Sequence, residues 1–241
     1  MTSARIVFLA VLALLAGCAT SLSSDQVAAI VASPDRSAAD RANDIRRKPA
    51  EVLAFIGVLP GWVALDVSAG RGYTSELIAR AVGTQGRVYA QTQAPTPPAL
   101  AERTRNPATW NIVAVVRPVG DPVPPEVAHG ALDLVTLMFN YHDLGHMGVD
   151  RARMNLAIFN GLKRGGAYVI ADHSGRNGTG ISESGTLHRI EEAFVIAEVQ
   201  AAGFRLAASG NFLRNGADPR DRETPVPAMP KDEFVLKFVR P

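Results

Sequence analysis

Cysteine is almost absent from this sequence, because Cys18 is the only one among 241 residues. The rest of the chain therefore contains no disulfide and no other thiol. The net charge is only +2, which gives no bulk electrostatic reason to expect nucleic-acid binding. No internal repeat is visible, and 241 residues suit one sizeable core rather than two domains. With 47% hydrophobic and 20% charged residues, the composition is that of a globular protein.

Apolar runs long enough to cross a bilayer are also missing. Residues 6–16 are wholly apolar and follow Arg5, but a stable membrane span takes about 20 residues. The pattern instead predicts a secretory signal peptide over residues 1–17. Its end, the segment LAGC over residues 15–18, resembles the lipobox of bacterial lipoproteins, in which the signal is cut before the cysteine and the cysteine is then lipidated.

That resemblance implies a lipid anchor on Cys18, a short tether over residues 18–24, and a location on the periplasmic side of the cell envelope. It also implies the outer membrane, because Ala19 rather than an aspartate follows the cysteine. Several acyl chains on one cysteine give stable anchoring, whereas a single chain is marginal. The alternative is ordinary secretion with one free thiol.

The remaining chain divides into a helical start and a long alternation of strands and helices. Residues 25–60 are predicted to form an N-terminal helical extension, with helices over 25–32, 37–47 and 49–56. From Gly61 onward, strands are predicted at residues 62–67, 87–91, 111–117, 131–139 and 167–171, and helices at 73–82, 96–105, 150–162 and 184–202. Strands at 204–209 and 233–239, joined by a proline-rich loop over 211–231, are predicted to pair antiparallel. This alternation predicts an α/β fold with a mostly parallel sheet covered on both faces.

The segment LDVSAGRGYTSEL, residues 65–77, is a strand that runs through a glycine turn into a helix. Parallel sheets bind ligands beyond the carboxyl ends of their strands, and glycines there let the backbone approach a ligand closely. Asp66, at the end of the strand, can hold the turn or accept from an amine. The spacing fits neither G-x-G-x-x-G nor a P-loop, so a dinucleotide or nucleoside triphosphate is not predicted.

The turn resembles motif I of class I S-adenosylmethionine-dependent methyltransferases, in which an acid precedes G-x-G-x-G. In this chain the motif consists of Asp66, Ser68 in place of the first glycine, Gly70 and Gly72. Further similar segments follow in the family's order, at residues 86–90, 132–135, 140–144, 162–170 and 199–204. The chain looks closest to the exported, poorly characterised branch of these proteins.

The resemblance implies a Rossmann-like domain over residues 61–241, with a seven-stranded mostly parallel sheet, one C-terminal antiparallel strand, and S-adenosylmethionine as cofactor. It implies methyl transfer to a small molecule or an envelope component. The cofactor-binding residues that it implies are Asp66, Ser68, Gly70, Gly72, Tyr73, Gln91, Asp121 and Asn140. Gln91 stands where the family usually has an acid for the ribose hydroxyls, and Asp121 is nearest to the place of an acid that meets the adenine. For catalysis we predict His142 as a base, with Asp143 and Tyr141 beside it.

Two other functions remain open. Export favours a non-catalytic lipoprotein that uses the fold to bind a metabolite or a partner, because the cofactor is made in the cytoplasm. A metal-dependent hydrolase would need a ligand set, and His142 and His146 are spaced as two ligands on one helix face. However, Gly145 and Gly148 favour a loop, and H-E-x-x-H is absent, so we predict no metal site. The basic run at residues 46–48 is predicted to be a solvated helix face, with binding of a phosphate or a substrate as the alternative. The oligomeric state is not predicted.

Overall fold

The computed structural model describes residues 21–226 and 228–241. The predicted signal peptide and residues 18–20 of the tether, Cys18 included, lie outside the described residues. Within the described part of the chain, every helix is too short or too polar to cross a membrane.

Three helices precede the sheet: α1 (Ser24–Val31), α2 (Ala38–Arg47) and α3 (Pro49–Ile56). Ser23 caps α1 one residue earlier than predicted, since its hydroxyl accepts from the amide of Gln26 at 3.2 Å in a capping box. Lys48 joins α2 to α3 in a left-handed conformation with φ 45°. This sharp junction turns the end of α2 toward the sheet.

Seven strands form one sheet in the order β3-β2-β1-β4-β5-β7-β6. The strands are β1 (Val63–Val67), β2 (Arg87–Thr92), β3 (Ile112–Val116), β4 (Leu132–Met138), β5 (Leu162–His173), β6 (Arg205–Gly210) and β7 (Glu233–Val239). Strand β7 is antiparallel to both of its neighbours, and the other strands all point one way. The predicted fold class, including the single antiparallel C-terminal strand, is confirmed.

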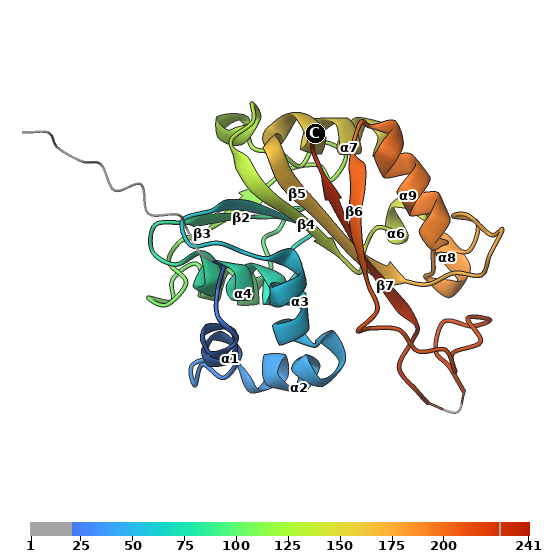
Figure 1. Ribbon diagram of the computed structural model, residues 1–241, viewed down its shortest axis with the longest axis horizontal. Helices are drawn as coiled ribbons and strands as arrows, with labels where there is room; N and C mark the ends of the chain where they lie inside the picture. Colours follow the sequence, from blue (N-terminus) through green and yellow to red (C-terminus); the bar gives the residue numbers. More distant parts are fainter. Residues whose placement is uncertain (1–20, 227) are drawn as a thin grey trace, which may run out of the picture.

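Helices cover both faces of the sheet (Figure 1). The other helical segments are α4 (Tyr73–Val82), α5 (Pro98–Arg103), the 3₁₀ turn η1 (Pro125–Val127), α6 (Asp143–His146), α7 (Arg151–Gly161), α8 (Ser184–Leu187) and α9 (Glu192–Ala201). Because side chains alternate along a strand, each face has its own core. Leu65 packs into the core beneath α7 and α9, while Ala64 packs into the core beneath α1, α3, α4 and α5.

Two expected elements differ from the structure. The single helix predicted over residues 184–202 is broken between α8 and α9, because His188 is left-handed at φ 50° and Ile190 makes a β-bridge to Ser174. The loop predicted around Gly145 contains the one-turn helix α6 instead. A glycine is needed there, since a Cβ on Gly145 would lie 2.6 Å from Ile181 Cγ1.

Candidate functional site

The turn between β1 and α4 is organised around a buried carboxylate. Asp66 is 2% exposed, and its oxygens accept hydrogen bonds from the hydroxyls of Ser75 at 2.6 Å and Thr136 at 2.7 Å. Burial raises the pKa of Asp66 to about 6, although both hydroxyl bonds and the charge of Arg47 lower it. Asp66 is therefore mostly ionised above pH 6 and can face a cation.

Ser68 has the backbone conformation that a glycine would favour, with φ 54°. Its amide donates to Gln91 Oε1 at 2.8 Å, while Gln91 Nε2 donates to the carbonyl of Arg117 at 2.7 Å. Gln91 is fully buried and does not line the neighbouring cavity. The structure therefore places Gln91 behind the turn, where it holds Ser68, and not at a ribose site.

The two glycines of the turn have different surroundings. Gly70 is exposed at φ 55°, and a Cβ there would meet nothing closer than 3.9 Å. A Cβ on Gly72 would lie 2.8 Å from Arg103 Cδ and 2.9 Å from Leu100 Cδ1. Gly70 is thus the glycine that leaves room for a ligand, whereas Gly72 lets α5 pack against the turn.

Helix α2 is fastened over this turn by ion pairs. Arg103 reaches Asp40 at 2.6 Å, also pairs with Glu76, and donates to the carbonyl of Arg71 at 2.8 Å. The Tyr73 hydroxyl, predicted to contact the cofactor, donates to Asp44 on α2 at 2.6 Å. The helical extension therefore forms one wall of the site.

Between α2 and the turn lies a cavity of about 560 Å³. Its wall includes Asp66, Ser68, Gly70 and Tyr73 from the turn, Met138 at the end of β4, and Arg47 from α2. A cavity of this size at the carboxyl end of β1 lies where a ligand of a parallel α/β sheet is expected.

Arg47 is the unusual member of this wall. Its guanidinium carbon lies 4.0 Å from the centre of the Phe139 ring and 5.7 Å from that of Tyr73. Among the residues that the structure describes, it has neither a hydrogen-bond nor an ion-pair partner. Burial and the charge of Arg46 lower the pKa of Arg47 to about 10, so it stays charged at neutral pH. A charged guanidinium without a partner, facing a cavity, can bind an anion.

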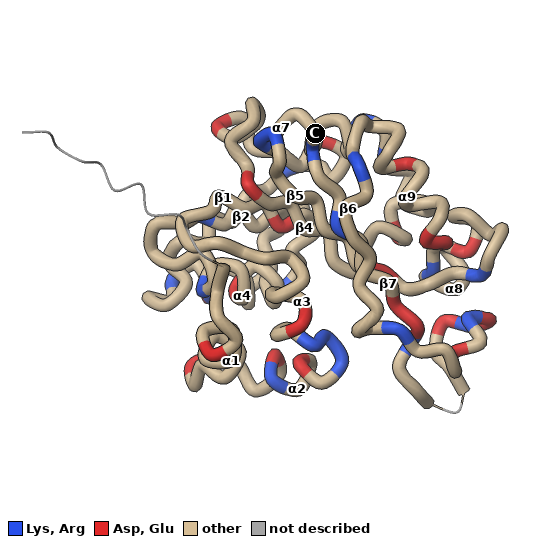
Figure 2. The backbone as a smooth tube through the Cα atoms, in the orientation of Figure 1, with Lys and Arg blue, Asp and Glu red and all other residues tan. Residues whose placement is uncertain are grey.

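The basic run that contains Arg47 is a solvated face only in part, because Lys48 is exposed but Arg46 and Arg47 are half-buried. Arg46 pairs with Glu233 at 2.6 Å, and Lys48 donates to the carbonyl of Phe212 at 2.5 Å. Figure 2 shows this basic segment opposite the acidic start of β7. Short basic runs usually face solvent, and nothing else in the sequence indicated that this one faces a cavity.

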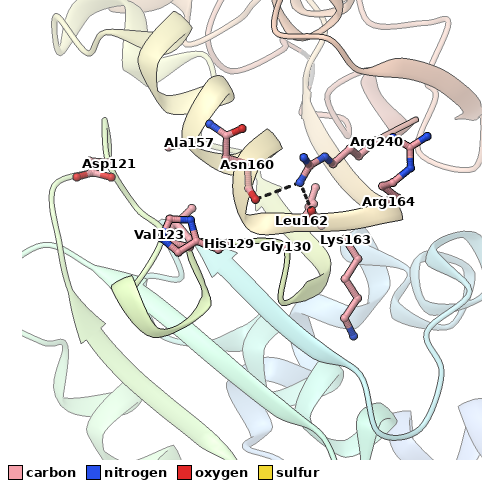
Figure 3. A pocket seen from close by; sticks show the side chains of 11 residues that line it. Asp121, Val123, His129, Gly130, Ala157, Asn160, Leu162, Lys163, Arg164 and Arg240 are labelled. Atoms are coloured by element: carbon pink, nitrogen blue, oxygen red, sulfur yellow. Dashed lines mark hydrogen bonds between the residues drawn. The ribbon is translucent and has the colours of Figure 1, made fainter.

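A second hollow, of about 800 Å³, lies near the opposite edge of the sheet, beside the starts of β4 and β5 (Figure 3). Its Arg240 is bound to the carbonyls of Asn160 at 3.1 Å and of Leu162. Asp121, predicted to meet the adenine, lines this hollow and pairs with Arg117 at 2.9 Å. The structure therefore does not bring Asp121 to the cavity beside Asp66.

The segment after β4 brings several of the predicted catalytic residues together. His142 Nδ1 lies 2.6 Å from the buried Asp172 and Nε2 lies 3.1 Å from Asp143, whose other oxygen accepts from Asn140 Nδ2 at 2.9 Å. Burial alone would lower the pKa of His142, but Asp172 and Asp143 outweigh it and raise that pKa. Both ring nitrogens of His142 face carboxylates, so neither is free for a substrate in this arrangement.

Tyr141 points away from this group. It is fully buried between α7 and α9, where its hydroxyl donates to Glu198 at 3.0 Å and accepts from Asn155 at 2.9 Å. Packing is the role that the structure gives to Tyr141. The third side chain beside His142 and Asp143 is instead that of His188, whose Nδ1 lies 2.8 Å from Asp143 Oδ1. The helix predicted over residues 184–202 included His188, because nothing local indicated the break after α8.

The strand order, the one antiparallel strand and the turn after β1 together define the fold of class I S-adenosylmethionine-dependent methyltransferases. No protein-family model and no curated protein matches the chain by sequence. Among solved structures, an S-adenosylmethionine-dependent methyltransferase from Aquifex aeolicus matches with a TM-score of 0.64 and 16% identity, over 91% of this chain and 100% of that one.

Two further matches are methyltransferases by description. CrArsM, an arsenic(III) S-adenosylmethionine methyltransferase from Chlamydomonas reinhardtii, has a TM-score of 0.58 and 17% identity over 88% of this chain and 72% of that one. An S-adenosylmethionine-dependent methyltransferase from Mesorhizobium loti has a TM-score of 0.57 and 15% identity over 80% of this chain and 96% of that one. At these identities the similarity establishes the fold.

Proposed function

We propose that this protein transfers a methyl group from S-adenosylmethionine to a small-molecule or envelope acceptor. The observation that carries the proposal is that one cavity at the glycine turn of this fold contains a cation, Arg47, which has no partner among the described residues, and a buried anion, Asp66. An amino acid carries a carboxylate and an ammonium, which are complementary to these two groups. The opposite charges of Arg47 and Asp66 therefore fit the carboxylate and the ammonium of the methionine part of the cofactor.

Each residue has a separate role in binding. Arg47 binds the carboxylate, Asp66 holds the ammonium, and the backbone at Gly70 leaves space for the chain between them. Helix α2, fastened by Arg103, holds Arg47 at the cavity wall, and the partial burial of Arg47 and the burial of Asp66 strengthen both electrostatic contacts. The bound cofactor would supply an electrophilic methyl group on a sulfonium. The acceptor binds beyond Met138, on the side of Asn140 and His142, so that the reacting atoms are held in line.

The proposal also includes the location of the protein in the cell. Lipidation of Cys18 tethers the domain to the periplasmic side of the envelope, in the outer membrane, and residues 18–24 provide the tether. The support for this location comes from the sequence around Cys18 alone, because Cys18 lies outside the described part of the chain.

A second function, binding of a metabolite without catalysis, is favoured by one observation. The residues predicted for the ribose and the adenine, Gln91 and Asp121, do not line the cavity. A site that recognises only an amino-acid end would bind methionine about as well as the full cofactor.

Calorimetric titration of the purified full-length chain separates the two functions. We expect S-adenosylmethionine and S-adenosylhomocysteine to bind at least 100-fold more tightly than methionine. Equal affinities for all three would favour the metabolite-binding function, and no binding of either adenosyl compound would reject methyl transfer. Arg47→Met should weaken binding, while Arg87→Met serves as the matched control, because Arg87 is exposed and its side chain has no hydrogen-bond or ion-pair partner among the described residues.

A further inference from the structure

Four of the five histidines of the described chain gather at the carboxyl ends of β4 and β5. The ring centres of His142 and His173 are 5.4 Å apart, those of His142 and His188 are 5.7 Å apart, and those of His146 and His188 are 5.6 Å apart. Asp143 lies among them. Such a concentration of imidazoles around one carboxylate calls for a physical explanation.

The hydrogen bond to Asp172 fixes which nitrogen of His142 carries its proton. A carboxylate only accepts, so Nδ1 of His142, at 2.6 Å from Asp172, must be protonated. Neutral His142 then presents the lone pair of Nε2 to Asp143 Oδ1 at 3.1 Å. Two acceptor atoms at this distance repel each other unless a cation, either a proton or a metal ion, lies between them.

We propose that His142 Nε2, Asp143 Oδ1 and His188 Nδ1 bind one divalent transition-metal ion. One ligand atom from each of these residues lies within 4.8 Å of the other two, and Asp143 Oδ1 is 3.1 Å from His142 Nε2 and 2.8 Å from His188 Nδ1. Ligand bonds of about 2.0–2.2 Å place neighbouring ligand atoms roughly 3–3.5 Å apart, so small side-chain rotations close the site around an ion. Two imidazoles and one carboxylate favour zinc or iron(II) over magnesium or calcium.

The residues behind the ligands hold them in place. Asp172 is fully buried and accepts from the backbone amides of His142 at 2.7 Å and His173 at 2.8 Å, which fixes its position against the His142 ring. Asn140 binds Oδ2 of Asp143 and leaves Oδ1 for the ion. A carboxylate behind a ligating histidine is a common support in metal sites, because it orients the ring and raises its basicity.

Charge also favours a cation here. Among the residues that the structure describes, Asp143 and Asp172 pair only with histidines, and neither has a lysine or arginine partner. With neutral imidazoles the two carboxylates leave a charge of about −2, which one divalent ion neutralises.

The site is open on one side. The side chains of Asp143 and His188 are 24% and 37% exposed, so an ion can enter and keep a free coordination position. Placing an oxygen of the methyl acceptor at that position rests on the proposed function. Metal binding itself does not rest on it. Measuring S-adenosylmethionine binding on the same sample therefore shows whether the metal site or the proposed methyltransferase function has failed.

The test uses the full-length chain, stripped with a chelator and titrated with Co²⁺ by visible absorption and then with competing Zn²⁺. We expect one equivalent to bind. His188→Ala and Asp143→Asn should each weaken binding at least 100-fold, whereas His129→Ala, in the hollow at the opposite edge, should leave it unchanged. Zn²⁺ at 100 times its dissociation constant should raise the melting temperature of the wild type by roughly 5–10 °C and that of the two site variants by much less.

The proposal is overturned if the wild-type chain binds substantially less than one equivalent, or if both site variants bind as tightly as the wild type. Circular dichroism of the variants checks that they are folded. Asp143→Asn has nearly the same size as the native residue, so loss of binding in a folded Asp143→Asn protein cannot be attributed to a collapsed site. A proton in place of the metal would leave the melting temperature insensitive to Zn²⁺, and this result would also overturn the proposal.

Discussion

Replacing Arg47 with methionine distinguishes a ligand-binding arginine from a structural one. A structural arginine stabilises the fold through its partners, and its removal leaves buried acceptors unsatisfied. Arg47 has no such partner among the described residues, and its main contact is the Phe139 ring at 4.0 Å. Methionine keeps an apolar contact with that ring and removes the charge.

The two effects have opposite signs and can be estimated. Loss of the cation–π contact costs about 0.5–2 kcal/mol, while relief of burying an unpaired charge offsets a similar amount. The free energy of unfolding should therefore change by no more than about 1 kcal/mol. A hydrogen bond to a charged group contributes about 1.5–3 kcal/mol, so the affinity for S-adenosylmethionine should fall roughly 10- to 150-fold. Since the pKa of Arg47 is about 10, the wild-type charge is present at the assay pH of 8.

Urea denaturation measures the free energy of unfolding, and calorimetry at pH 8 measures the affinity for S-adenosylmethionine. Arg87→Met, at an exposed arginine without a side-chain partner among the described residues, controls for the loss of one positive charge. It should leave the free energy of unfolding and that of cofactor binding each within about 0.5 kcal/mol of the wild type. The reasoning is refuted if Arg47→Met binds S-adenosylmethionine within twofold of the wild type. It is also refuted if this variant loses several kcal/mol of stability, because Arg47 would then have a structural role.

Three other outcomes are expected. Burial raises the pKa of Asp66 from 3.8 to about 6, so its ionisation destabilises the fold as the pH rises from 4 to 6 and has no effect below pH 4. Between pH 4 and pH 7.5, the free energy of unfolding of Asp66→Asn, measured in urea, should therefore rise by roughly 3 kcal/mol relative to that of the wild type. Parallel pH curves for the two proteins would contradict this. Gly72→Ala should lower the free energy of unfolding by about 2–4 kcal/mol, because its Cβ would lie 2.8 Å from Arg103 Cδ. Gly70→Ala should lower it by about 1 kcal/mol and weaken cofactor binding. Equal melting temperatures for the two variants would exclude this difference. The wild type should incorporate a labelled fatty acid and Cys18→Ser should not, and equal labelling of the two proteins would argue against the lipid anchor.

The sheet could be predicted because its signals are local. Each apolar strand is bounded by glycine, proline or a helix with its own periodicity, and these segments follow one another in a regular order. The alternation from Gly61 onward therefore predicted the strand directions, and even the antiparallel β7 followed from the missing helix after β6. Segments whose local pattern was ambiguous, such as the one around His188, were the ones predicted wrongly.

The site could be predicted only in part, because it depends on where distant segments meet. Asp66 and Gly70 belong to the turn itself and were found from it. Arg47 reaches the same cavity from α2, and its direction is set by the left-handed Lys48 that follows. No periodicity encodes that placement. For the same reason the boundary predicted at residue 60 does not separate the helical extension from the site, because one wall of the cavity lies before it.

The two departures from the family's motif belong together physically. Ser68 in place of glycine takes a left-handed conformation, which costs a non-glycine residue about 1–2 kcal/mol. Gln91 offsets this, because its amide accepts from the Ser68 amide and also donates to the carbonyl of Arg117. A carboxylate at position 91 could accept from Ser68 but could not donate to Arg117, so it would face that carbonyl with a lone pair. Glutamine thus fits the backbone of this turn, because it supplies both an acceptor for the amide of residue 68 and a donor for the carbonyl of Arg117. It is not independent evidence that the cavity has lost its ligand.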